Sequence, residues 1–104
     1  MLYRQGDVLL VAAKAPKGAA AVKRTKRGLV LAEGEATGHA HVITDESAEL
    51  VTADEAAELY LLVHGTKAVP LTHDEHDTIL VPPGTYRVVR QREYSPEEIR
   101  RVAD

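Results

Sequence analysis

The 104-residue chain contains no cysteine, no tryptophan and no phenylalanine. Without cysteine it can form neither disulfides nor thiolate metal sites. Leucine, valine, isoleucine, alanine and the four tyrosines must therefore build the hydrophobic core, which we expect to be compact and aliphatic. Any bound metal would have to be held by histidine and carboxylate side chains.

The chain also lacks long apolar segments and a secretion signal. No run approaches roughly 18 consecutive apolar residues, and no charged start leads into an apolar run with a small-residue cleavage site. We therefore expect a cytoplasmic protein with no membrane partner. The net charge of −3 argues against general binding of nucleic acid through overall basicity. The basic residues are nevertheless concentrated in residues 14–27 and 87–101, so an anionic ligand can meet a local positive field.

Several catalytic motifs are missing as well. The sequence has no P-loop, no dinucleotide-binding glycine pattern and no nucleophile elbow. The only serines are Ser47 and Ser95, and Ser95 fits the cap of a helix. Covalent catalysis by serine or cysteine is therefore not expected.

Short apolar or alternating segments separated by turn residues predict an all-β fold. Strands are expected over residues 4–11, 29–32, 37–44, 48–51, 58–63, 67–71, 78–81 and 85–92, with a long basic loop over 12–28. Residues 52–62 also fit a helix, because Thr52 and Glu55 match a capping box, but we favour a turn at 53–56 followed by the strand. Ser95, Pro96 and Glu98 predict a short C-terminal helix to about Val102. The pattern indicates a single domain over 1–104, a small barrel or sandwich of about seven or eight short strands.

Four of the five histidines are candidates for chemistry. His39 and His41 alternate within a predicted strand, so both imidazoles should lie on the same face of the sheet. His73 and His76 lie in the polar loop 72–77, and His64 is expected to be structural. A pair of neutral imidazoles can bind a divalent transition metal such as Zn, Ni or Fe, or can transfer protons near neutral pH.

The first and last predicted strands carry groups suited to an anionic nucleotide. These are Arg4 and Gln5 at one end of the chain and Arg90, Arg92 and Tyr94 at the other. Guanidinium groups bind phosphate through paired hydrogen bonds, and a tyrosine ring can stack on a base. If the two strands are neighbours, these groups gather at one end of the fold.

Two short patterns resemble the cupins. His39 and His41 followed by Glu46 resemble the first metal motif of that family, and Pro82-Pro83-Gly84 resembles the corner of the second. The resemblance implies a β-barrel that holds a metal through His39, His41 and Glu46. The chain departs from the family at the last histidine ligand, where it has Arg87.

A longer pattern resembles a family of small bacterial proteins known mainly as uncharacterised. It comprises RQGDVLL (4–10), GEATGHAH (34–41) and LVPPGTYRVVRQREYSP (80–96). The chain is also similar to small ring nucleases, which remove cyclic oligoadenylate signals in type III CRISPR antiviral defence. That resemblance implies metal-independent cleavage of phosphodiester bonds by attack of a ribose 2′-hydroxyl.

We therefore predict a metal-independent phosphodiesterase that cleaves RNA or a cyclic oligonucleotide by histidine acid–base catalysis and needs no cofactor. The expected catalytic residues are His39, His41, His73 and His76, and the expected substrate-binding residues are Arg4, Gln5, Arg90, Arg92 and Tyr94. A symmetric cyclic ligand would suit a homodimer. The alternatives are a cupin-like metal-binding protein centred on His39 and His41, and a non-catalytic interaction domain in which the histidines are incidental.

Overall fold

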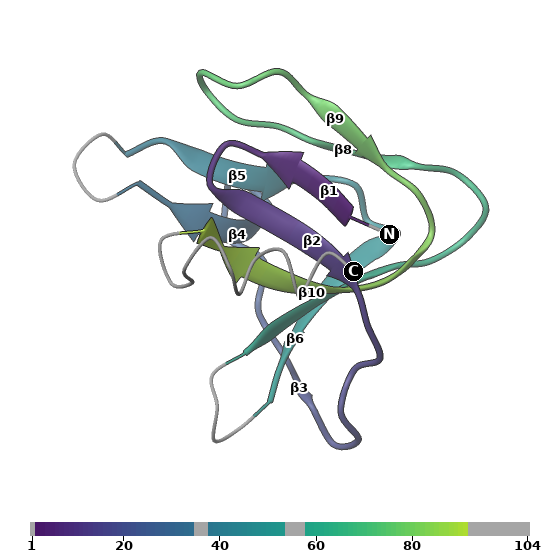
Figure 1. Ribbon diagram of the computed structural model, residues 1–104. Helices are drawn as coiled ribbons and strands as arrows, with labels where there is room; N and C mark the ends of the chain where they lie inside the picture. Colours follow the sequence, from purple (N-terminus) through teal and green to yellow (C-terminus); the bar gives the residue numbers. More distant parts are fainter. Residues whose placement is uncertain (1, 35–37, 54–57, 92–104) are drawn as a thin grey trace.

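The computed structural model describes residues 2–34, 38–53 and 58–91, and within them the protein is all-β, as predicted (Figure 1). These residues form ten strands and no α-helix. The strands are β1 (Leu2–Gln5), β2 (Val8–Ala12), β3 (Ala20–Ala21), β4 (Leu29–Glu33), β5 (Ala40–Ile43), β6 (Ala48–Thr52), β7 (Leu59–Val63), β8 (Val69–Leu71), β9 (Ile79–Val81) and β10 (Gly84–Arg90).

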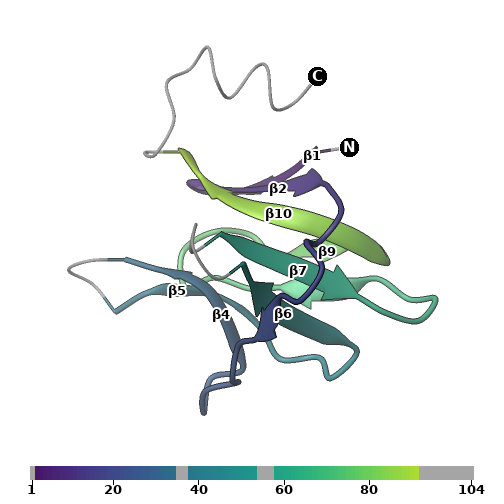
Figure 2. The same cartoon turned by 90° about the horizontal axis from the view of Figure 1, so that it is seen from below.

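Six of these strands form one antiparallel sheet in the order β1-β2-β10-β7-β6-β3. The β4–β5 and β8–β9 hairpins form two smaller sheets, joined where Val42 and Thr72 exchange backbone hydrogen bonds of 2.9 Å. Figure 2 shows β2 and β10 side by side on one side of the molecule and the β4–β5 hairpin on the other. The described strands therefore form a small sandwich and not a closed barrel.

The core between these layers is aliphatic, as the composition predicts. Its fully buried side chains are mainly leucine and β-branched residues, which suit a pleated surface. They include Val8, Leu10, Leu29, Ile43, Leu50, Leu61, Val69, Leu71 and Val81. Tyr86 adds an aromatic ring to this cluster, and its hydroxyl donates to the Pro82 carbonyl across 2.7 Å.

The N-terminal segment differs from the prediction of a single strand over 4–11. It is a hairpin, because Gln5 pairs with Val8 and leaves only Gly6 and Asp7 in the turn. Gly6 has a φ of +58°, a left-handed conformation that glycine adopts without a steric penalty. A glycine–aspartate pair between two strands is a recognised hairpin signal, and here it outweighs the continuous strand propensity. The turn places the Asp7 carboxylate at the tip of the hairpin.

Three further predicted segments can be compared with the structure, and they agree with it to different extents. Residues 58–63, which also fitted a helix, contain strand β7, and residues 54–57 lie outside the described part of the chain. The long loop 12–28 contains the short strand β3, which pairs with β6. The expected C-terminal helix at 95–102, together with Arg92 and Tyr94, also lies outside the described residues. Among those residues no helix is long and apolar enough to cross a membrane.

Candidate functional site

The fold gathers His39, His41, His73 and His76 into one cluster, which we call the histidine cluster. His73 is the common neighbour. The centroid of its ring lies 5.8 Å from that of His39, 4.4 Å from that of His41 and 4.6 Å from that of His76. The His41 and His76 rings are stacked with centroids 6.2 Å apart. His41 lies in β5 and His39 directly precedes that strand, and the other two come from the β8–β9 loop. The bridge between Val42 and Thr72 aligns these segments.

His41 is the buried member of the cluster, with 3% of the residue exposed. Its Nδ1 lies 2.9 Å from Gln5 Oε1, and its Nε2 lies 3.2 Å from Asp7 Oδ1. Both ring nitrogens therefore already have partners on the β1–β2 hairpin.

The orientation of the Gln5 amide assigns the tautomer of His41. Gln5 Nε2 donates to the carbonyls of Leu71 and Asp77 at 2.7 and 2.9 Å, so its Oε1 is the acceptor. His41 Nδ1 must then carry a proton, and in the neutral ring Nε2 carries the lone pair. The contact with Asp7 becomes a hydrogen bond when the ring is protonated, so Nε2 is the position where His41 gains and loses a proton.

Two opposing influences act on the pKa of His41. Burial and the neighbouring His73 lower it, while the hydrogen bond and charge of Asp7 raise it, and the balance holds the pKa of His41 below its ordinary value. The neutral ring is therefore the main form at neutral pH.

Asp7 links the histidine cluster to Arg90. Its Oδ1 faces His41, and its Oδ2 lies 3.4 Å from Arg90 Nη2, which also donates to the Glu33 carbonyl at 3.1 Å. Burial raises the pKa of Asp7, but the charge and hydrogen bond of Arg90, together with His41, outweigh it and hold the pKa below its usual value. Arg90 Nε is buried and has no hydrogen-bond partner among the described residues, so a donor remains beside the cluster.

The other three rings are more accessible. His73 Nδ1 accepts backbone N–H groups from Glu75 and His76 at 3.0 and 3.3 Å, so Nε2 carries the proton in the neutral ring. His39 Nδ1 lies 2.7 Å from Glu75 Oε1. The exposed His76 lies over Gly6, where an added β-carbon would be 2.5 Å from His76 Nε2. The turn therefore favours glycine at position 6, and a larger residue there would displace the His76 ring.

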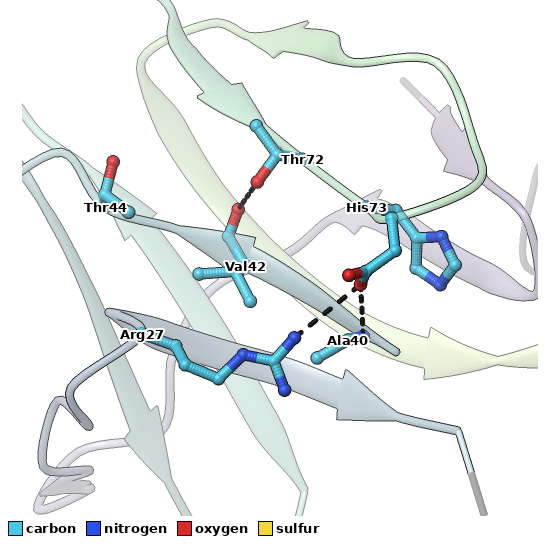
Figure 3. A pocket seen from close by; sticks show the side chains of 7 residues that line it. Arg27, Ala40, Val42, Thr44, Thr72 and His73 are labelled. Atoms are coloured by element: carbon cyan, nitrogen blue, oxygen red, sulfur yellow. Dashed lines mark hydrogen bonds and ion pairs between the residues drawn. The ribbon is translucent and has the colours of Figure 1, made fainter. Parts of the chain in front are cut away.

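An open pocket of about 320 Å³ adjoins the cluster, and His73 belongs to both. Figure 3 shows the side chains that line the pocket. Arg27 and Asp74 stand at its polar side, with Arg27 Nη2 3.6 Å from Asp74 Oδ1. The same carboxylate oxygen accepts the N–H of Ala40 at 3.2 Å, and this bond, with the charges of His39 and Arg27, lowers the pKa of Asp74 despite some desolvation. Asp74 is therefore an anion at neutral pH.

Of the remaining residues considered for the site, only some lie beside the histidine cluster. Gln5 and Arg90 adjoin the cluster, but Arg4 is exposed and donates to Gln91 Oε1 at the edge of the sheet. Arg92 and Tyr94 are outside the described residues. His64 is exposed and lies 3.1 Å from Glu49, away from the cluster.

The site residues predicted from the sequence do not include four of the charged groups beside the cluster. These are Asp7, Arg27, Asp74 and Glu75. The turn signal of Gly6 and Asp7 could have identified Asp7, whereas Asp74 and Glu75 are evident in the sequence as carboxylates that flank the loop histidines, although they are not among the predicted site residues. Nothing in the sequence near Arg27 indicates that it belongs to the site. It contacts Asp74 of the β8–β9 loop, which is distant in the sequence.

The arrangement does not reproduce a cupin ligand set. Glu46 lies in the turn between β5 and β6, and His41 Nε2 faces the Asp7 carboxylate. In the described part of the chain, no three His, Asp or Glu side chains form a group that could hold a metal ion. The metal site built on His39, His41 and Glu46 stays an untested prediction.

Comparisons with known proteins place the chain in one family. Comparisons with curated proteins and with solved structures found no significant match. Residues 4–91 match the model of a domain of unknown function, DUF8820, and this match carries no link to ring nucleases or cupins. The match spans β2 to β10 and every residue of the histidine cluster. The chain therefore belongs to the family of the domain of unknown function DUF8820.

Proposed function

We propose that this protein is a metal-independent phosphodiesterase that cleaves RNA or a cyclic oligonucleotide, of the cyclic oligoadenylate type, by histidine acid–base catalysis. The observation that carries the proposal is the meeting of three imidazoles around that of His73, with ring centroids 4.4–5.8 Å from it. Histidine transfers protons near neutral pH, and each well-placed acid or base accelerates a reaction by about 10²–10⁴-fold.

The reaction in this proposal is an internal displacement at phosphorus. One imidazole takes the proton of the ribose 2′-hydroxyl, and the 2′-oxygen forms a bond to phosphorus. The bond from phosphorus to the 5′-oxygen breaks, and a second imidazole, protonated beforehand, gives its proton to that oxygen. The products are a 2′,3′-cyclic phosphate and a free 5′-hydroxyl.

The accessible rings suit the two proton transfers. We assign these to His39 and His76, which flank His73 in the cluster and are more exposed than His41. The protonated Nε2 of His73 suits a hydrogen bond to a non-bridging phosphate oxygen. His41, expected from the sequence to be an acid or base, is assigned a positioning role, because it is buried, its Nδ1 donates to Gln5 and its Nε2 faces Asp7.

Two cations support binding of an anion at this place. Arg90 has a buried Nε without an acceptor among the described residues, and Arg27 lies at the adjoining pocket. Arginine charge stabilises the negative charge that develops on a transferring phosphoryl group. Arg92 and Tyr94 keep their proposed substrate-binding roles as predictions.

The proposal extends to assembly and location. A symmetric cyclic ligand presents equivalent bonds to two copies of one site, so we propose a homodimer with one histidine cluster in each subunit. A signalling oligonucleotide made inside the cell requires a cytoplasmic enzyme.

One observation favours the metal-binding alternative. His41 donates from Nδ1 to Gln5 Oε1, and an imidazole that ligates a metal through one nitrogen typically donates from the other. Mass spectrometry of the intact native protein tests this alternative, which requires about one equivalent of metal that is lost when His39 and His41 become alanine.

Product analysis tests the proposed reaction. An RNA oligonucleotide should yield 2′,3′-cyclic phosphate and 5′-hydroxyl ends, and a matched oligonucleotide with a single 2′-deoxy residue should resist cleavage at that position. Products with 5′-phosphate ends, or cleavage at the deoxy position, would contradict the proposal because both require an external nucleophile.

A further inference from the structure

The pocket beside the histidine cluster combines an apolar wall with two opposite charges. Ala40 and Val42 of β5 form the apolar part, and Thr44 and Thr72 add hydroxyl groups (Figure 3). The Thr72 hydroxyl is already used, since it donates to the Val42 carbonyl at 3.2 Å. At about 320 Å³ the pocket is near the lower end of the roughly 300–1,000 Å³ of ligand pockets, a size that suits one nucleoside.

The two charges of the pocket contact each other and the backbone. Arg27 donates from Nη1 to the Gly38 carbonyl at 2.9 Å, and its Nη2 faces Asp74. These contacts hold the guanidinium plane at the pocket, where a base can stack on it. Asp74 is held by Arg27 and by the N–H of Ala40, so it stays beside the pocket as an anion.

The negative charge of Asp74 determines which part of a bound nucleotide can lie beside it. It repels a phosphate group, which must therefore lie at the His73 side of the pocket. It accepts hydrogen bonds from an amino group and disfavours a carbonyl oxygen at the same place, since two acceptors repel each other.

We propose that this pocket is the subsite for the base next to the cleaved phosphate, and that Asp74 selects a base with an exocyclic amino group. The inference rests on the proposed function, because it takes His73 as the point where pocket and phosphate meet. Cytosine and uracil are the closest pair of probes, since at the pyrimidine edge they differ by an amino group in place of a carbonyl oxygen and by an N3 lone pair in place of an N3–H group.

Binding of two non-cleavable dinucleotides tests the subsite. The probes are CpC and UpU, each carrying a 2′-O-methyl group on the first ribose so that the 2′-oxygen cannot attack. Titrations monitored by NMR should give roughly tenfold tighter binding of the CpC analogue, the ratio expected from one hydrogen bond to a charged acceptor. The amide signals of Ala40, Val42 and Thr72 should shift with either probe.

Two substitutions in the β8–β9 loop supply the matched comparison. Asp74→Asn should remove the preference, because an amide can donate to the uracil oxygen as well as accept from the cytosine amino group. Asp77→Asn removes the same charge from a nearby exposed residue and should keep the preference.

A second pair of substitutions tests the stacking role of Arg27. Arg27→Ala should weaken binding of both probes, whereas Lys26→Ala, on the same turn, should not.

The outcomes separate this inference from the proposed function. Equal affinity of the wild-type protein for the two probes, or a preference that survives Asp74→Asn, overturns the subsite. If the protein shows no such base preference but still cleaves unmethylated CpC and UpU, the proposed function stands without the subsite. Failure of both binding and cleavage overturns the two together.

Discussion

Gln5 Oε1 accepts a hydrogen bond from His41 Nδ1 across 2.9 Å, so the first strand of the protein determines which nitrogen of a buried histidine can exchange a proton. The same amide donates to Leu71 and Asp77, which lie at the two ends of the loop that carries His73 and His76. One side chain therefore joins β1, β5 and the β8–β9 loop.

Replacing Gln5 by leucine should be strongly destabilising. The substitution removes the partner of the buried Leu71 carbonyl, of the part-buried Asp77 carbonyl and of one ring N–H, which should lower the free energy of unfolding by about 2–4 kcal/mol. Denaturant unfolding monitored by circular dichroism measures the change. Gln91→Leu is the matched control, because Gln91 is exposed, and it should stay within about 0.5 kcal/mol of wild type. Equal effects at the two positions would contradict the role assigned to Gln5.

Replacing Gly6 by alanine should displace His76. The new β-carbon would lie 2.5 Å from His76 Nε2, so the ring must move away from the cluster. Gly18 is the control, because its φ of +77° is also left-handed but no atom lies within 4 Å of an added β-carbon. Both variants should lose about 1–2 kcal/mol of stability from backbone strain. Only Gly6→Ala should shift the ring signals of His76 in NMR spectra, and an unchanged His76 signal would refute the contact.

Acid should destabilise the protein through His41. The pKa of His41 is lowered in the folded state from an ordinary value of 6.5, so below that pH the unfolded chain binds more protons than the folded one. The stability that neutral His41 contributes is fully present above about pH 6.5 and is lost as the pH falls through the folded pKa. Unfolding curves at pH 8 and pH 5 should show this loss in the wild type and a smaller loss in His41→Gln. His64→Gln should retain the wild-type loss, and a loss unaffected by either substitution would exclude His41 as its source.

Removing the charge of Asp7 should lower the pKa of His41 further. The hydrogen bond and the charge of Asp7 both raise that pKa, while burial and His73 continue to lower it in the Asp7→Asn variant. The titration midpoint of the His41 ring, followed by NMR, should move to lower pH. Asp45→Asn, in the distant β5–β6 turn, should leave it unchanged. A midpoint that rises in Asp7→Asn would mean that the carboxylate does not face the ring in solution.

Much of the fold follows from local sequence signals. Residues 58–63 and 85–92 are apolar or alternating runs bounded by turn residues, and they contain β7 and most of β10. The β1–β2 hairpin is hard to predict because, in RQGDVLLV, strong strand formers follow Gly6 and Asp7 but do not precede them. The polar start of this segment therefore resembles the beginning of the same strand. The strand β3 consists of two alanines and exists because it pairs with β6, which no local pattern shows.

The candidate site is predictable only in part. Alternation alone places His39 and His41 on one face, but their meeting with His73 and His76 depends on the long-range pairing of Val42 with Thr72. The burial of His41, which changes it from an accessible base to a positioning group, depends on Gln5 and Asp7 from the other end of the chain. Such contacts are fixed by tertiary packing and leave no periodic signal.

The most direct test of the account is the cleavage of RNA or a cyclic oligonucleotide by EDTA-treated protein, compared among the wild type and His76→Ala, His73→Ala and His64→Ala variants. Wild-type turnover should persist in EDTA, because no step needs a metal. His76→Ala and His73→Ala should each reduce it by about 10²–10⁴-fold while remaining folded, and His64→Ala should leave it unchanged. Turnover that EDTA abolishes, or that is unchanged in His73→Ala and in His76→Ala, would contradict the central claim.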